Sequence, residues 1–187
     1  MKEQIMAAAI SLFARYGYKK TTIDDIAREL HIAKANIYRH FANKEDLYHQ
    51  AVSSVLDAWR AYVQEKISAV SDSAERFRHM SEIAIRYPKS NPDFCNILLN
   101  DPDIFSLSTR RDNYRSINKS AQDLLRGVLE EGVSKGVFRD VNIEYTTELL
   151  FSIYMMHLIK IYGHGEGDAG IEMYLYCTDL ILRGLRK

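Results

Sequence analysis

The amino-acid sequence predicts an all-α protein of about nine helices. Apolar residues recur at helical spacing along the chain, no sustained segment alternates strictly between apolar and polar residues, and glycine and proline number only 9 and 3 of 187 residues. With 47% hydrophobic residues, the chain can bury a core of its own. The formal net charge of zero excludes a polybasic tail protein and an acidic disordered chain, although basic residues can still cluster locally.

The N-terminal part is expected to form a head of three helices. The first helix has an apolar stripe over residues 5–16 and ends at Gly17, a residue typical of helix C-termini. Thr21 and Thr22 both offer an N-cap for the second helix, with Asp24 and Asp25 each three residues on, at capping-box spacing. Three residues then separate it from a third helix, predicted over about 34–40.

The remainder of the chain is also helical in pattern. Asn43 is expected to cap a long fourth helix with Asp46 three residues later. Further helices are predicted over residues 73–87, 93–100, 107–135, 143–162 and 170–185. We place the domain boundary after residue 46, so that residues 1–46 form the head and residues 47–187 form a second helical domain.

Two short helices joined by three residues have the geometry of a helix-turn-helix, whose second helix enters the DNA major groove. If Ile37 and Phe41 face the core, the opposite side of the third helix presents polar and basic residues. Arginine, asparagine and alanine can contact guanine, adenine and the thymine methyl group, whereas lysine, tyrosine and histidine suit phosphates. The candidate DNA-contacting residues of this helix are Lys34, Ala35, Asn36, Tyr38, Arg39 and His40.

The charge pattern of the head supports this interpretation. No acidic residue occurs between Glu29 and Glu45, whereas Lys34, Arg39 and Lys44 all fall in that interval. The start of the fourth helix adds a positive dipole end near Lys44, which suits a phosphate. Charge alone favours the alternative of a helical bundle with a solvated basic face. The short turn, the caps and the exposed polar set together favour DNA binding.

Two runs of residues in the head form a specific pattern. They are Ala8-Ala9-x-x-Leu12-Phe13-Ala14-x-x-Gly17-Tyr18-x-x-Thr21-Thr22-x-x-Asp25-Ile26-Ala27 and Ile37-Tyr38-Arg39-His40-Phe41-x-x-Lys44-Glu45-Asp46-Leu47. This pattern closely resembles the DNA-binding head of TetR-family transcriptional regulators. The resemblance covers residues 5 to about 52, and the rest of the chain is similar to the family only in its helical style.

The resemblance implies a homodimer that binds operator DNA, usually as a repressor, and that a small ligand in the C-terminal domain releases. By position, it implies major-groove contacts from Lys34, Ala35, Asn36 and Tyr38. It implies phosphate contacts from Thr22, Tyr38, His40 and Lys44. Two positions depart from the family pattern: His31 stands where the turn usually has glycine, and Ala33 stands where a serine or threonine usually caps the third helix.

The last two predicted helices are apolar on more than one face, which predicts burial on several sides. A two-fold dimer interface is one use of such helices, and the resemblance implies the same use; a buried monomer core is the alternative. Aromatic and polar side chains set in apolar surroundings are candidates for ligand contact, although core packing uses the same residue types. These candidates are Trp59, Tyr62, Asn118, Tyr154 and His157.

Other functional classes find little support in the sequence. It contains no H-E-x-x-H motif, nucleophile elbow, P-loop or paired Cys/His metal spacing, so we expect no catalytic residue, metal or cofactor. We see no signal peptide, and the longest apolar run is too short for a bilayer, so a cytoplasmic protein without membrane contact is expected. The alternative functions are a helical small-molecule-binding or dimeric scaffold protein whose head does not bind DNA specifically, and an architectural DNA binder without a ligand.

Overall fold

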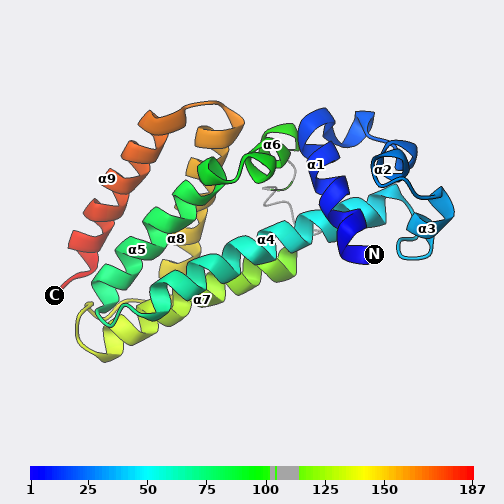
Figure 1. Cartoon of the computed structure of the whole chain (residues 1–187). Helices are drawn as coiled ribbons and strands as arrows, with labels where there is room; N and C mark the ends of the chain where they lie inside the picture. The colour runs from blue at the N-terminus through cyan, green and yellow to red at the C-terminus, as the bar shows by residue number, and fades with distance from the viewer. Residues whose placement is uncertain (102–103, 105–113) are drawn as a thin grey trace. The chain divides into compact units, whose positions relative to one another are not determined.

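The computed structural model describes residues 1–101, 104 and 114–187, and every regular element in them is helical (Figure 1). The α-helices are α1 Lys2–Lys20, α2 Ile23–Glu29, α3 Lys34–Tyr38, α4 Lys44–Ser68, α5 Ser73–Arg86, α6 Pro92–Asn100, α7 Arg115–Ser134, α8 Ile143–Leu158 and α9 Gly167–Leu185. A 3₁₀ segment, η1, spans Tyr87–Ser90, and a π-helical turn, η3, spans Ile159–Gly163. The predicted all-α class is confirmed.

Most predicted helix boundaries agree with the structure within a few residues, and three differ informatively. Gly17 is predicted to end the first helix; it has φ 77° and kinks α1, but the helix continues to Lys20. The helix predicted over 143–162 is α-helical only to Leu158, because η3 closes with a hydrogen bond across five residues. The helix predicted over 107–135 is seen as α7, and its first part, residues 107–113, lies outside the described residues.

The first compact unit contains Met1–Asp57 and Pro88–Asn113. Within it, α1 packs against α2 and α6, and α2 packs against α3 (Figure 1). Asn100 at the end of α6 donates a hydrogen bond from Nδ2 to the Ala14 carbonyl at 3.0 Å, and the Tyr48 hydroxyl donates to Asp101 at 2.5 Å. Packing thus groups α6 with the predicted head. The boundary after residue 46 stays a prediction.

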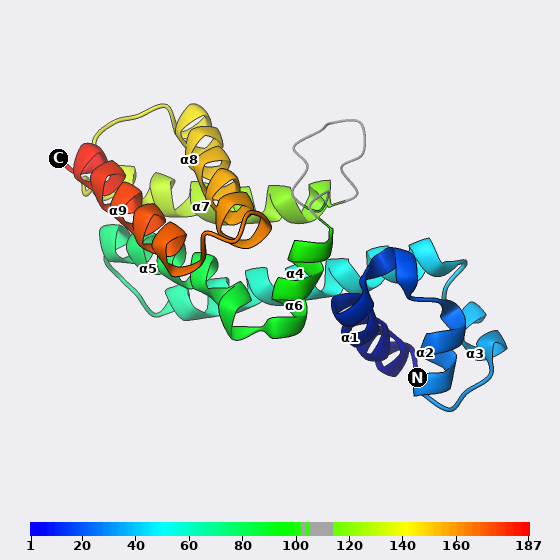
Figure 2. The same ribbon diagram turned by 90° about the horizontal axis from the view of Figure 1, so that it is seen from above.

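The second compact unit contains Ala58–Tyr87 and Tyr114–Lys187. Its helix α5 packs against both α7 and α9, while α8 packs against α7 and α9 (Figure 2). Gly132 on α7 lies against the buried ring of Phe138, which occupies the space that a Cβ atom would need. Glycine at this position therefore lets the chain after α7 fold back tightly.

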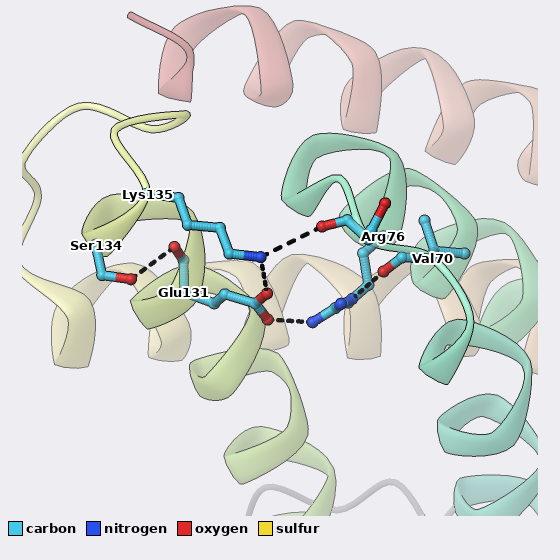
Figure 3. A network of polar contacts seen from close by, with 6 residues as sticks. Val70, Arg76, Glu131, Ser134 and Lys135 are labelled. Atoms are coloured by element: carbon cyan, nitrogen blue, oxygen red, sulfur yellow. Dashed lines mark hydrogen bonds and ion pairs between the residues drawn. The ribbon is translucent and has the colours of Figure 1, made fainter.

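A polar network joins the start of α5 to the end of α7 (Figure 3). The Glu131 carboxylate accepts hydrogen bonds from both Arg76 and Lys135, and Arg76 also donates from Nε to the Val70 carbonyl at 2.7 Å. Lys135 reaches the Ser71 carbonyl at 3.5 Å. The two basic residues, with Lys135 as the main contributor, lower the pKa of Glu131. The network thereby fixes the loop between α4 and α5 on α7.

Candidate nucleic-acid interface

Helix α2 begins with the reciprocal capping that the sequence predicts. The Thr22 hydroxyl oxygen accepts a hydrogen bond from the Asp25 N–H at 3.2 Å. The Asp25 carboxylate accepts in return from the Thr22 N–H at 3.0 Å and from the Thr22 hydroxyl at 2.6 Å. These hydrogen bonds from Thr22 lower the pKa of Asp25. The capping box is confirmed, and the predicted phosphate contact of Thr22 stays a prediction.

The turn between α2 and α3 contains both departures noted in the sequence. His31 has φ 53°, in the left-handed region where glycine is favoured. Ala33 occupies the N-cap position of α3 in an extended conformation and makes no side-chain capping hydrogen bond. A left-handed conformation costs a non-glycine residue about 1–2 kcal/mol. Two local backbone hydrogen bonds nevertheless close the end of α2, from the His31 N–H to the Arg28 carbonyl at 3.1 Å and from the Ile32 N–H to the Ala27 carbonyl at 3.0 Å.

Helix α3 has one buried side and one exposed side. Ile37 is 0% exposed and Phe41, just beyond the helix, is 2% exposed, which confirms their predicted inward position. Asn36 is half-buried at the edge between the two sides. The exposed residues on or directly after this helix are Lys34, Ala35, Tyr38, Arg39 and His40. All six candidate DNA-contacting residues of this helix thus lie at least partly accessible to a partner.

The ammonium group of Lys34 is paired across the helix-turn-helix. Its Nζ lies 2.6 Å from Oδ1 of Asp24, and both side chains are about half exposed, at 54% and 52%. Hydrogen bonding to this carboxylate raises the pKa of Lys34. The contact joins the first turn of α2 to the first residue of α3. Sequence reasoning missed Asp24 as part of this surface, because ten residues and a turn separate the two side chains.

Lys44 is anchored to the end of α1. Its Nζ donates hydrogen bonds to the carbonyls of Tyr18 at 2.6 Å and Thr21 at 2.8 Å, and it lies 4.2 Å from the centroid of the Tyr18 ring. An ammonium group has three donors, so two are used here and one remains for a phosphate. Lys44 thus ties the start of α4 to the residue before Thr22. Its predicted phosphate contact stays a prediction.

Four of the five candidate ligand-contacting residues lie in or beside one aromatic cluster of the second unit. The Trp59 ring stacks 6.1 Å from Tyr87 and also lies 6.1 Å from Tyr154, while Tyr62 lies 5.2 Å from Tyr87. The Tyr154 ring lies in turn 6.0 Å from Tyr174. Sequence reasoning missed Tyr87 and Tyr174, because neither stands out from the many other tyrosines of the chain.

His157 joins this cluster through Tyr174, at a ring distance of 5.2 Å. It is buried at 3% exposure, and its Nδ1 lies 2.8 Å from the Ile153 carbonyl within α8. Burial raises the pKa of Tyr154 well above its usual value and that of Tyr174 to about 12, so both hydroxyls are protonated at neutral pH. Asn118, the fifth candidate, is half-buried on α7.

Helices α8 and α9 carry a set of exposed large hydrophobic side chains. Their exposed fractions range from 42% to 71%. The residues are Tyr145, Leu149 and Met156 on α8 and Met173, Tyr176 and Leu180 on α9. Spacings of four and seven residues on α8, and of three and four on α9, place each set along one side of its helix. Each helix therefore has a buried apolar side and an exposed apolar side.

The described residues contain neither a candidate metal site nor a helix that could span a membrane. No group of three or more His, Cys, Asp or Glu side chains in this part of the chain is arranged to hold a metal ion. No helix in the described ranges combines the length and the apolarity needed to cross a bilayer.

The chain is similar to several known proteins. Residues 5–51 match the family described as bacterial regulatory proteins, tetR family. The transcriptional repressor NicS from Pseudomonas putida is 24% identical over 200 residues, covering 100% of this chain and 92% of that protein. The regulator PfmR from Thermus thermophilus is 29% identical with a TM-score of 0.68, covering 98% of this chain and 99% of that one. FadR from Bacillus subtilis, in complex with stearoyl-CoA, is 17% identical with a TM-score of 0.82 and complete coverage of both chains.

The helix-turn-helix, with its exposed polar recognition helix, defines a DNA-binding transcriptional regulator. The head of the chain, residues 5–51, matches the tetR family of bacterial regulatory proteins. The resemblance found in the sequence is thereby confirmed.

Proposed function

We propose that the protein is a cytoplasmic homodimeric repressor that binds a palindromic operator through α3 of each subunit. A small molecule bound among the C-terminal helices releases it from the DNA. The observation that carries the DNA-binding part is the two-sided construction of α3, in which Ile37 is fully buried while Lys34, Tyr38 and Arg39 are exposed. Repression is supported by the similarity to NicS, a repressor related along the whole chain.

Base recognition is assigned to Asn36, Arg39 and Ala35. An asparagine can hydrogen-bond both the N6 and N7 positions of adenine, and an arginine can do the same with O6 and N7 of guanine. The small side chain of Ala35 leaves room for a thymine methyl group. Tyr38, His40, Thr22 and Lys44 are assigned to phosphate oxygens, which position the helix without reading sequence.

Dimerisation is assigned to the exposed apolar sides of α8 and α9. Side chains such as Leu149, at 61% exposure, and Tyr176, at 65%, leave apolar area in water unless a partner covers it. A second copy of the same chain offers a self-complementary surface through a two-fold axis. A two-fold dimer presents two recognition helices, so its operator is expected to be an inverted repeat.

Ligand binding is assigned to the aromatic cluster around Trp59, Tyr62, Tyr154 and His157. Aromatic walls with a few polar groups are typical of small-molecule sites, and the complex of FadR with stearoyl-CoA supports ligand binding by a protein of this fold. Asn118 remains a weaker candidate. Trp59 and Tyr62 lie on α4, the helix that begins at Lys44 in the head. A ligand that binds one orientation of α4 better than another would shift the protein toward that orientation. Operator affinity would then change by at most the ratio of the ligand's affinities for the two orientations.

In-vitro selection from random duplex DNA tests the DNA-binding part directly. Purified protein is used at about 0.1 M salt, because phosphate-driven affinity falls steeply with salt. We expect enrichment of an inverted repeat. A folded protein that enriches no sequence, with or without added cell metabolites, would favour the alternative of a helical small-molecule-binding or dimeric scaffold protein.

Two variants separate base reading from phosphate contact. Asn36→Ala is expected to relax the selected base at one position in each half-site, because a bidentate pair discriminates by about 1–3 kcal/mol. Tyr38→Phe removes only a hydroxyl and is expected to weaken binding to all sequences alike. An unchanged consensus for Asn36→Ala would exclude Asn36 as a reader of sequence.

A further inference from the structure

A carboxylate lies on the surface that the recognition helix presents to DNA. Asp24 is the second residue of α2, and its Oδ1 is 2.6 Å from Nζ of Lys34, the first residue of α3. The neighbouring Asp25 takes the capping hydrogen bonds of α2, so the Asp24 carboxylate is left to pair with Lys34. The segment between Glu29 and Glu45, which contains α3, has no acidic residue of its own, so the carboxylate that pairs with Lys34 comes from Asp24 on α2.

The Asp24–Lys34 ion pair bears on specificity because every DNA sequence offers the same phosphates to a lysine. Binding to non-operator DNA depends almost entirely on the charges that lysine and arginine bring to the backbone. A lysine already paired with a carboxylate neutralises a phosphate less fully, since the phosphate must displace or share its ammonium group. At an operator, base contacts fix the position of α3, which favours transfer of the Lys34 ammonium group from Asp24 to a phosphate. Non-operator DNA offers no such base contacts.

We propose that Asp24 is a specificity-determining residue, which holds back the charge of Lys34 from non-operator DNA. The inference rests on the proposed function, in which α3 enters the major groove. The Asp24–Lys34 ion pair lowers the affinity for non-operator DNA more than it lowers the affinity for the operator. It also directs the lysine side chain toward α2, so that its position on the operator is restricted.

The test measures the affinity of the whole protein for the selected inverted repeat and for a duplex of scrambled sequence, between about 0.05 and 0.2 M salt. For Asp24→Asn, we expect about three- to tenfold tighter binding to the scrambled duplex and a smaller gain on the inverted repeat. The salt slope on the scrambled duplex is expected to steepen by about 0.9, the value for one additional neutralised phosphate. The ratio of the two affinities therefore falls.

Two matched variants distinguish the ion pair from net charge. Glu29→Gln removes the same charge from an exposed position on the same helix, and it is expected to change the salt slope little. In a Lys34→Met background, Asp24→Asn is expected to lose its effect on the slope, because no ammonium group is left to release. Thermal unfolding of each variant verifies that the head remains folded.

The outcomes separate the two levels of the argument. If Asp24→Asn behaves like Glu29→Gln, or keeps its full effect without Lys34, the ion pair does not govern specificity and the inference is wrong. The proposed function is unaffected by this result, because it depends on whether the wild-type protein selects an inverted repeat. If the wild-type protein binds neither duplex, the proposed function fails and the inference fails with it.

Discussion

Helix α3 and the pair α8 and α9 both present exposed side chains, but of opposite chemistry. The exposed side of α3 carries Lys34, Arg39 and the hydroxyl of Tyr38, whereas α8 and α9 expose residues such as Leu149 and Leu180. In both regions a helix buries one side and leaves the other for a partner. Helical spacing determines which positions are exposed, while residue type at those positions supports the partner proposed for each region, DNA for α3 and a second subunit for α8 and α9.

The two regions also differ in how their geometry is held. In the helix-turn-helix, contacts close in sequence set the helix starts, as in the Thr22–Asp25 capping box. In the second unit, hydrogen bonds between distant segments also position the helices, as where the Tyr162 hydroxyl donates to the Ile85 carbonyl at 2.6 Å. A substitution at a helix cap of the head is therefore expected to affect the helix that it caps. Substitutions on the exposed sides of α8 and α9 are expected to affect dimerisation.

The largest expected effect comes from the apolar surface. Replacing Leu149 and Leu180 together by aspartate places two charges where a partner subunit is expected to pack, and an unpaired buried charge is strongly unfavourable. We expect the dimer dissociation constant to rise at least about 100-fold, at 1.4 kcal/mol for each factor of ten. Analytical ultracentrifugation across a concentration series measures the change, and operator affinity is expected to fall with it.

Leu99→Asp serves as the matched control for this experiment. Leu99 on α6 is 47% exposed and Leu180 on α9 is 49% exposed, so the two leucines are equally accessible in the chain. We expect Leu99→Asp to leave the oligomeric state unchanged. Equal dissociation in both variants, or a monomeric wild-type protein, would contradict the assignment of dimerisation to α8 and α9.

Lys44→Met is expected to have the next largest effect. The substitution keeps the apolar stem but removes two charge-assisted hydrogen bonds, to the carbonyls of Tyr18 and Thr21. Hydrogen bonds to charged groups contribute about 1.5–3 kcal/mol, so a loss of about 2 kcal/mol in unfolding free energy is expected, since water replaces part of the interaction. Urea unfolding measures it. Lys20→Met, at an exposed site near the same end of α1, is the control of equal charge.

The same variant tests the phosphate contact proposed for Lys44. If its third donor reaches a phosphate, the salt slope of operator binding falls by about one. An unchanged slope together with reduced stability would restrict Lys44 to positioning α4 on α1.

Much of the head could be predicted from the sequence because its signals are local. Thr22 and Asn43 each mark a helix start through their own hydrogen bonds, and the structure places both as predicted, whereas Gly17 kinks α1 but does not end it. The burial of Ile37 and Phe41 followed from helical spacing alone. These features need no knowledge of how distant parts of the chain pack.

The contacts that the sequence did not reveal join distant residues. The pairing of Asp24 with Lys34 depends on the angle between α2 and α3, and the stacking of Trp59 on Tyr87 joins α4 to the end of α5. Spacing along one helix cannot report such contacts. The role of Lys44 at the α1 terminus was missed for the same reason, since 26 residues separate it from Tyr18.

A smaller and stabilising effect is expected at the start of α3. Ala33 is in an extended N-cap conformation but has no side-chain acceptor for the free N–H groups of the helix. Serine at this position supplies that acceptor, so Ala33→Ser is expected to increase the unfolding free energy by about 1 kcal/mol. Ala42→Ser, an exposed position just before the Asn43 cap, is the control. No gain over this control would mean that α3 is held by packing alone.

The smallest expected effect concerns the polar network of the second unit and its dependence on pH. Lys135 and Arg76 lower the pKa of Glu131 in the folded protein, so the folded state favours the ionised carboxylate more than the unfolded state does. The stabilisation is therefore present above the pKa of an unfolded glutamate, about 4.3, and is lost as the pH falls through the lower folded value. Glu131→Gln is expected to flatten the acid limb of the stability curve.

The measurement is urea unfolding at a fixed protein concentration between about pH 3 and pH 7, a range that spans the ordinary glutamate pKa. Glu130→Gln, at the exposed neighbouring position outside the Glu131 network, is expected to keep the wild-type slope. Because the network is partly exposed, added salt should weaken the Glu131 contribution by screening. If Glu131→Gln and Glu130→Gln gave the same curve, the ion pairs of Glu131 would not stabilise the junction of α5 and α7.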